Sequence, residues 1–435
     1  MRTLKQFKGF SVILHLLLFV LIMLLYLMNY SHAEVFNHSY KVTHLPGFDG
    51  PLPFELETGY IGVDKEEAQL FYYFFESENN PKEDPLLLWL TGGPLCSAMS
   101  TILYEIGPLQ LEMDKYEALP KLFLRQYSWT KFASIIFVDF PAGAGFSYAT
   151  TPRANCSGDF EASRSINEFI RKWLTNHPQY LSNPLYLGGD SYTGFTLPYY
   201  FVKMVSGNER GLQPFLNLKG YILGNPATDR FIDGNSQVAF AHGMGLISDE
   251  LYESMQKTCG GNYQLVDSSN IKCRNEIQSF ELGLLGIQIT HILEDFCDIE
   301  SLNVNDIRGT KRRIIIDDTN RLLSFKKKLS SCRKEGYLVA RSWMNSKSVQ
   351  DAFQVRKGTI SEWIRCNYAY DYTYDIITSV PYHAQLSAKG FRSLIYSGDH
   401  DMIVPFVGTQ AWIRSLNYSI VDDWRKWLVD GQIAG

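Results

Sequence analysis

The sequence predicts an α/β fold, with a mostly parallel central sheet, helices on both sheet faces and a helical insertion. Several short, continuously apolar runs end in glycine or small polar residues, and helical patterns lie between them. Such runs are typical of strands buried on both faces, as in a parallel sheet covered by helices. From about residue 236 to residue 366 amphipathic helical patterns take over, together with most of the cysteines. We interpret that segment as a helical cap.

The N-terminus is predicted to be a targeting segment. Two lysines precede an apolar run over residues 10–28, and Ser31 and Ala33 occupy the −3 and −1 positions of a cleavage site. We therefore expect a signal peptide over residues 1–33. An uncleaved anchor is the alternative, because the run is nearly long enough to span a bilayer. The sequence holds no second apolar run of that length, so we expect a secreted or vacuolar chain without stable membrane association.

The core is expected in two parts, residues 34–235 and residues 367–435. Its strands are predicted at the apolar runs 86–90, 135–138, 185–187, 221–223 and 394–396. A helix is predicted over residues 162–173, because acidic residues open it and basic residues close it, as the helix dipole prefers. Ligands of parallel sheets bind at the carboxyl ends of the strands, where the polar residues after these runs fall.

The cap is expected over residues 236–366, and its polar stretch 298–331 is expected to be an exposed loop. None of the seven cysteines forms a C-x-x-C pair, so neither a zinc site nor another metal or cofactor is expected. In a chain that enters the secretory route, three sequons become candidate glycosylation sites. They are Asn37, Asn155 and Asn417.

Composition excludes two classes of protein. A hydrophobic fraction of 45% with 14% aromatic residues excludes general disorder. The net charge of −5, with no basic stripe interleaved with aromatics, argues against a nucleic-acid partner.

The segment Gly188–Gly194, which reads GGDSYTG, is the strongest motif in the chain. It follows the apolar run 185–187 and precedes a helical pattern, which is the strand–turn–helix context of a nucleophile elbow. The last glycine comes one place later than in the G-x-S-x-G form. A serine in such a turn is exposed, but its hydroxyl needs a base to become a nucleophile. Ser191 is therefore the candidate nucleophile.

A second glycine turn, Thr91–Pro94, follows the predicted strand 86–90. Its backbone N–H can point toward the serine. Together with the N–H of Tyr192, the residue after the nucleophile, it would form an oxyanion hole.

From about His44 to its end the chain resembles the serine carboxypeptidase-like proteins of plants. This group of α/β-hydrolases includes serine carboxypeptidases and acyltransferases that use glucose esters. The motifs that carry the resemblance are residues 45–48, 54–60, 89–96, 143–148, the elbow and 396–405. The resemblance implies that Ser191 is the nucleophile, that Asp401 rather than Asp399 orients a histidine, and that Gly93 and Tyr192 donate to the oxyanion. It also implies the disulfides Cys96–Cys366, Cys259–Cys273 and Cys297–Cys332, which leaves Cys156 unpaired.

Two positions favour the acyltransferase branch. Carboxypeptidases of the family typically carry asparagine in the glycine turn and glutamate before the serine, where this chain has Thr91 and Asp190. With Gly92, these residues are the candidate substrate-binding group. We expect Ser191 to take an acyl group from a glucose ester and pass it to an acceptor. Two alternatives remain for the chain: a carboxypeptidase that takes peptide C-termini, and a non-catalytic secreted protein. For Asp190 the alternative is a purely structural role, in which it stabilises the elbow.

Two departures from the family pattern are expected to matter. The family's Gly-Gly-Pro-Gly-Cys has leucine at its fourth residue here, Leu95; a positive φ there would cost about 1–2 kcal/mol. None of the nine histidines follows Asp401, whereas the family places its catalytic histidine beyond the position of Gly435. We therefore expect a truncated C-terminus, impaired catalysis, and an uncovered sheet edge beside the strand 394–396.

Overall fold

A computed structural model of the chain describes residues 39–112, 119–154, 158–296 and 333–435. Several predicted features lie outside these described residues, namely the signal peptide 1–33, the cap loop 298–331, Asn37, Asn155, Cys156, Cys297 and Cys332.

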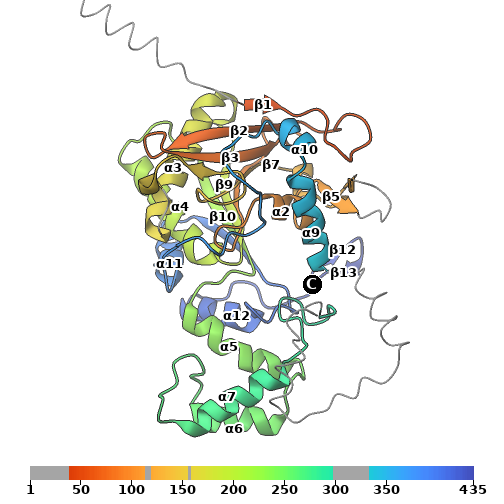
Figure 1. Ribbon diagram of the computed structural model, residues 1–435. Coiled ribbons are helices and arrows are strands. Elements are labelled where there is room, and N and C mark those ends of the chain that lie inside the picture. The colour runs from red at the N-terminus through yellow and green to blue at the C-terminus, as the bar shows by residue number, and fades with distance from the viewer. Residues whose placement is uncertain (1–38, 113–118, 155–157, 297–332) are drawn as a thin grey trace, which may run out of the picture. The chain divides into compact units, whose positions relative to one another are not determined.

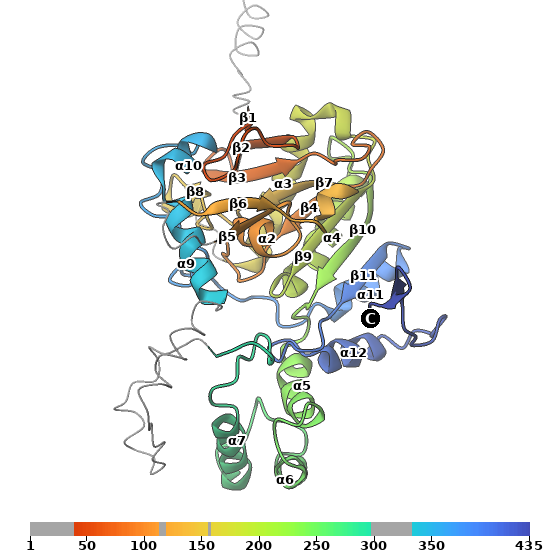
Figure 2. The same cartoon turned by 90° about the vertical axis from the view of Figure 1, so that its right-hand side faces the viewer.

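One mixed sheet forms the centre of the fold (Figures 1 and 2). Its strands follow the order β1 (Ser39–Lys41), β2 (Leu56–Val63), β3 (Ala68–Phe75), β7 (Ser134–Val138), β4 (Leu86–Leu90), β9 (Leu185–Asp190), β10 (Leu218–Gly224) and β11 (Arg392–Tyr396). β2, β3 and β7 pair antiparallel, and β8 (Tyr148–Ala149) also pairs with β3. From β7 through β4, β9 and β10 to β11 every pairing is parallel. The α/β architecture predicted from the apolar runs is confirmed.

Two small hairpins and the helices complete the described part. The hairpins are β5 (Leu109–Glu112) with β6 (Lys121–Leu124), and β12 (Leu428–Val429) with β13 (Gln432–Ile433). The α-helices are α2 (Met99–Tyr104), α3 (Asp159–Asn176), α4 (Thr193–Glu209), α5 (Arg230–Gly243), α6 (Asp249–Cys259), α7 (Ile271–Gly283), α9 (Arg333–Met344), α10 (Lys347–Ala352), α11 (Val380–Ala388) and α12 (Phe406–Ser415). No helix among the described residues has the length and apolar character needed to cross a bilayer.

The sheet is buried on both faces, as the continuously apolar strands predict. Alternate residues of β4 enter two separate apolar cores: Leu88 faces α3 and α4, while Trp89 faces α2, α9 and α10. Both side chains are fully buried. Figure 2 shows α9 and α10 on the opposite side of the sheet from α4. This two-sided burial holds the central strands, and with them the loops at their carboxyl ends.

β11 is the terminal strand of the sheet within the described residues. Its side chains are much more exposed than those of the central strands, with Leu394 at 55% and Tyr396 at 39%. Its parallel register with β10 still determines where along the sheet the loop after β11 begins.

Helices α5, α6 and α7 form a group with its own small apolar cluster, which includes Val238, Met255, Phe280 and Met402. Figure 1 shows this group below the sheet, joined to it through α5 and the neighbouring α12. The structure contains the disulfides Cys96–Cys366 and Cys259–Cys273, the two implied pairings whose cysteines are all described. The division of the chain into core and cap at residues 236 and 366 stays a prediction.

The different burial of β4 and β11 leads to a stability prediction. Leu88→Ala is expected to lower the free energy of unfolding by about 2–5 kcal/mol, because it leaves a cavity in a closed core. Leu394→Ala is the matched control, a leucine in the same sheet that is already half exposed, and should cost less than about 1 kcal/mol. Urea unfolding followed by circular dichroism measures both. Equal losses would contradict the view that the core lies at β4.

Candidate active site

The elbow has the backbone geometry that its sequence predicts. β9 ends at Asp190, Ser191 follows with a φ of +54°, and α4 begins at Thr193. A non-glycine residue in this left-handed region carries about 1–3 kcal/mol of strain, which the surroundings must hold in place. They do so through two hydrogen bonds: the Ser191 N–H donates to the carbonyl of Gly224 (3.0 Å), and the Ala227 N–H donates to the carbonyl of Ser191 (2.9 Å).

The late glycine of the motif has a packing reason. A Cβ atom on Gly194 would lie 2.5 Å from the carbonyl oxygen of Ala227, which is closer than real Cβ contacts allow. The first turn of α4 therefore rests directly on the backbone of the β10–α5 connection. This contact explains why glycine stands at position 194, one residue later than in the G-x-S-x-G form.

The second glycine turn lies against the elbow. A Cβ on Gly92 would lie 2.7 Å from the Cβ of Ser191 and 3.1 Å from the backbone nitrogen of Tyr192. Gly93 has a φ of +127°, and Leu95 has a φ of +64°. Leu95 therefore adopts the left-handed conformation expected to be costly for it. It is buried, and its carbonyl accepts a hydrogen bond from the Asn367 N–H (3.0 Å).

Asp190 is half-buried beside this turn. Its Oδ1 accepts a hydrogen bond from the Gly92 N–H (3.1 Å), so the side chain joins the elbow to the glycine turn. Burial raises the pKa of Asp190 to about 6, although the Gly92 bond and the charge of Arg365 both favour the ionised form. Thr91 lies nearby with its hydroxyl 2.8 Å from the hydroxyl of Thr101.

A second carboxyl, Glu105, lies beside Asp190. It is the residue that follows α2. Although Glu105 as a whole is exposed, protein surrounds its carboxyl closely enough for burial to raise its pKa well above the usual range, and the charge of Asp190 raises it further. Both carboxyls therefore favour the neutral form more than an isolated acid does. The sequence analysis missed Glu105, since an isolated glutamate after a short apolar helix carries no recognisable signal.

Asp401 lies in the loop after β11. Its Oδ2 accepts a hydrogen bond from Asn225 Nδ2 (2.8 Å), and its Oδ1 accepts from the N–H groups of Ile403 (2.8 Å) and Val404 (3.2 Å). Burial raises the pKa of Asp401 despite these donors. Asp399, by contrast, has a side chain that is 75% exposed and contacts only the neighbouring His400 ring (2.7 Å). The preference for Asp401 over Asp399 therefore agrees with their surroundings. Asn225, which the sequence analysis gave no role, fixes the orientation of Asp401.

Among the described histidines, His291 lies near the acid loop and His383 is buried against α12. No hydrogen bond in that part of the chain joins a histidine to Ser191 or Asp401. His291 approaches the acid loop: its ring stacks on His400 with centroids 5.5 Å apart, and its charge lowers the pKa of Asp401. His383 is buried against Trp412, and burial lowers its pKa to about 3, so it stays neutral.

Tyr192 is held by a buried carboxylate that the sequence analysis also missed. The Tyr192 hydroxyl donates to Asp159, at 2.9 Å from both carboxylate oxygens. Asp159 also accepts from the Tyr372 hydroxyl and the Ile376 N–H, each at 2.9 Å. It is fully buried at the start of α3, and burial raises its pKa. Asp159 thus joins the elbow to the segment that precedes α11.

The Asp159 contacts lead to a second prediction. Asp159→Ala leaves two tyrosine hydroxyls and one amide without their acceptor in a buried place, so the free energy of unfolding should fall by about 2–4 kcal/mol. Asp371→Ala removes an exposed acid of the same segment and should change it by less than about 0.5 kcal/mol. Chemical denaturation with intact disulfides is the measurement. An unchanged stability of the Asp159 variant would mean that water replaces the carboxylate.

Comparison with known proteins identifies the family of the chain. The sequence pattern of the serine carboxypeptidase family matches residues 46–435. Serine carboxypeptidase-like 3 of Arabidopsis thaliana is 48% identical over 428 residues, covering 98% of this chain and 89% of the relative. Serine carboxypeptidase-like 17 of the same plant is 48% identical over 396 residues, covering 91% and 84%. The crystal structure of Kex1Δp, a prohormone-processing carboxypeptidase from Saccharomyces cerevisiae, shares the fold with a TM-score of 0.67 at 20% identity, over 91% of this chain and 86% of that chain. The chain belongs to the serine carboxypeptidase family.

Proposed function

We propose that this chain is built for acyl transfer through a seryl ester, with a glucose ester as the acyl donor. The Ser191 hydroxyl attacks the acyl carbonyl, the N–H groups of Gly93 and Tyr192 stabilise the oxyanion, and the sugar leaves as an alcohol. An acceptor alcohol then attacks the acyl-enzyme and restores the serine. Water in place of the alcohol makes the same machinery a hydrolase.

The observation that carries the choice of donor is the pair Asp190 and Glu105. Burial raises the pKa of Asp190 to about 6 and that of Glu105 well above its usual range, so at neutral pH Asp190 is mostly ionised and the pair carries negative charge. A negative pair repels the carboxylate of a peptide C-terminus, whereas a glucose ester carries no charge and offers hydroxyl groups to the same oxygens. The family resemblance at Thr91 and Asp190 supports the same choice.

The surroundings of the pair also suit an aromatic acyl group. The Tyr396 side chain lies close enough to Glu105 and Asp190 for their charges to raise its pKa beyond the effect of burial. The Trp129 ring lies 6.3 Å from the Tyr396 ring and 5.7 Å from that of Trp89. Tyr396 is 39% exposed, so its ring offers one aromatic face to a flat acyl chain such as a hydroxycinnamoyl group.

Carboxypeptidase activity is the second candidate, and the same pair favours it in acid. Below about pH 6 the pair gains protons, loses net charge and can donate a hydrogen bond to a carboxylate. A peptide C-terminus then becomes an acceptable ligand. The two functions therefore make opposite demands on the protonation of one pair of side chains.

The third candidate is a non-catalytic secreted chain. Asp401 accepts hydrogen bonds from Asn225 and two backbone amides, and no described histidine forms a hydrogen bond with it. We propose that catalysis by these 435 residues is slow for that reason.

The two described disulfides fit an oxidising compartment, and we propose that the chain travels through the secretory pathway to the vacuole or the exterior.

The reactivity of Ser191 tests the catalytic part of the proposal. The printed 435-residue chain is expected to react with a fluorophosphonate probe at pH 7 at least ~10³-fold more slowly than an active member of the family, because a serine without its base keeps only the oxyanion and binding contributions. Ser191→Ala provides the background. Labelling as fast as in the active relative, and absent in Ser191→Ala, would contradict the proposal and show that another group acts as base.

The choice of donor is tested by binding, which needs no turnover. In Ser191→Ala, calorimetric titration should give a blocked dipeptide a dissociation constant at least ~10-fold weaker at pH 7.5 than at pH 5. The raised pKa of Asp190 means that the pair gains negative charge across this range, and about 1.4 kcal/mol of repulsion is a tenfold change. A hydroxycinnamoyl-glucose should change by less than about 3-fold.

The controls separate the acid pair from general charge. In the Ser191→Ala background, the second substitution Asp190→Asn keeps an acceptor for the Gly92 N–H but removes the charge. The pH dependence of dipeptide binding should therefore become smaller. Adding Asp399→Asn, an exposed acid, should leave it unchanged. A dipeptide that binds more tightly than the glucose ester at pH 7.5 would reverse the assignment, and Thr91→Asn with Asp190→Glu should shift the preference toward the dipeptide.

A further inference from the structure

A cavity of about 300 Å³ lies among helices α5, α6 and α7, away from the elbow. Each of the three helices contributes to its wall, and Met402, which follows Asp401 in the chain, closes it on one side. Ser191, Gly93, Tyr192 and Asp401 are not among its lining residues. The cavity is open to solvent on one side, where Gln264, Glu281 and Ile289 are exposed, while its other side is buried.

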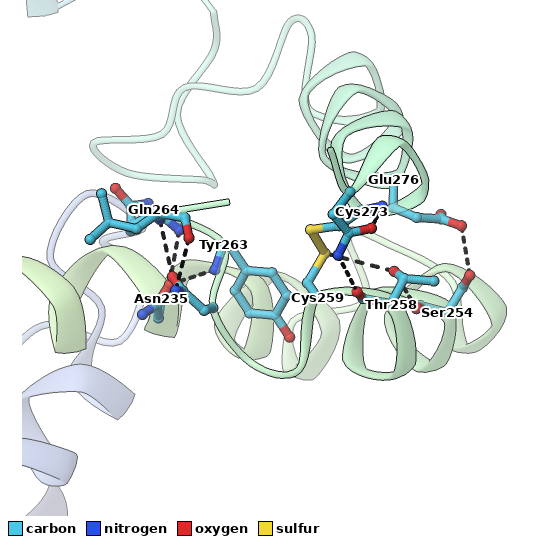
Figure 3. The surroundings of a disulfide bond; sticks show 11 residues. Asn235, Ser254, Thr258, Cys259, Tyr263, Gln264, Cys273 and Glu276 are labelled. Atoms are coloured by element: carbon cyan, nitrogen blue, oxygen red, sulfur yellow. Dashed lines mark hydrogen bonds between the residues drawn. A yellow bond between two sulfur atoms is a disulfide. The ribbon is translucent and has the colours of Figure 1, made fainter. Parts of the chain in front are cut away.

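One disulfide and several hydrogen bonds link the segments around the cavity to one another (Figure 3). The disulfide Cys259–Cys273 ties the end of α6 to α7, and the Ser254 hydroxyl donates to Glu276 Oε1 (2.6 Å) between the same two helices. On the other side Asn235 Oδ1, on α5, accepts from the N–H groups of Tyr263 (2.8 Å) and Gln264 (3.2 Å). The connection between α6 and α7 is therefore fixed over α5.

The wall of the cavity is mainly apolar. Val238, Met255 and Met402 form a buried floor, and Ile277 and Leu284 add half-buried apolar surface. A ligand that fills this space gains by removing apolar surface from water. Water molecules in the cavity would not provide this gain, because the apolar wall would stay hydrated.

Two polar features restrict the chemistry of the ligand. Tyr263 lines the cavity, and its hydroxyl is buried without a hydrogen-bond partner among the described residues. A buried donor of this kind is satisfied when the ligand brings an acceptor. Glu281, in contrast, is an exposed acid at the rim, where it disfavours an anion.

We propose that this cavity binds a small, uncharged, mostly apolar molecule that carries one hydrogen-bond acceptor. An apolar cavity of about 150 Å³ holds one benzene, so twice that volume suits a molecule of the size of a bicyclic aromatic. Ligand pockets in general begin at about this volume and combine apolar walls with few polar groups. The site is separate from Ser191 and does not depend on the proposed acyl transfer.

Met402 connects this site to the acid loop. The Met402 N–H donates to the carbonyl of Ile289 (2.9 Å), and the Gln237 side chain donates to the carbonyl of Ile403 (3.1 Å). A ligand on the cavity floor therefore contacts Met402, which belongs to the same loop as Asp401.

The test uses a fluorescent dye of the proposed chemistry, 6-propionyl-2-dimethylaminonaphthalene, which is uncharged and has one ketone acceptor. Its emission should shift to the blue on binding to the 435-residue chain, with one saturable site and a dissociation constant on the order of 10–100 µM. Ile277→Trp and Leu284→Trp each fill part of the cavity and should weaken binding at least ~10-fold. Gln278→Trp, exposed on the next residue of α7, should leave binding within about 2-fold of wild type.

Two further arms examine the polar features. Tyr263→Phe should weaken the dye about 3–10-fold, as expected for one lost hydrogen bond. As competitors, 2-acetylnaphthalene should displace the dye far better than 2-naphthoate, which has nearly the same shape but is an anion. Thermal unfolding checks that each variant is folded, and having two tryptophan variants keeps the test valid if one fails. Absence of a saturable site, or wild-type binding by a folded tryptophan variant, would overturn the proposal.

Discussion

The left-handed turn at Ser191 is the constraint on which the rest of this site depends. A φ of +54° is unfavourable for serine, so the conformation persists only because its neighbours hold it. Those neighbours come from the adjacent strand, since Gly224 accepts from the Ser191 N–H and Ala227 donates to its carbonyl. The close approach of Gly194 to Ala227 shows how little room the arrangement leaves. The parallel pairing of β9 with β10 therefore holds the half-buried serine at the carboxyl ends of the strands.

The strands on either side add the other parts of the site in the same manner. β4 delivers the glycine turn beside Ser191, and Asp190 joins the two through its bond to the Gly92 N–H. β11 delivers Asp401, which Asn225 at the end of β10 holds in orientation. Polar residues separated by up to three hundred positions in the chain thus meet because parallel strands end at one edge.

Several carboxyl groups around the site are buried. Asp139, Asp159 and Asp190 are all carboxyls whose pKa burial raises, and each accepts hydrogen bonds from the backbone of a different segment. Asp139, fully buried after β7, accepts from the Ser97 hydroxyl (2.7 Å) and the N–H groups of Ala98 and Phe146 (2.8 Å each). Such carboxylates hold loops in place at the cost of desolvation. The loops that they hold are those around Ser191.

The sequence by itself determined the fold class, and it predicted the elbow and the choice of Asp401 over Asp399. These follow from local patterns: apolar runs that end in glycine, a serine between tight turns, and motifs in a specific order. Only the tertiary structure decided the partnership of Glu105 with Asp190, the role of Asn225, the anchoring of Tyr192 by Asp159 and the cavity behind Met402. Each of these depends on desolvation or contact between distant segments. A glutamate, an asparagine or an aspartate carries no sign in the sequence of which backbone will surround it.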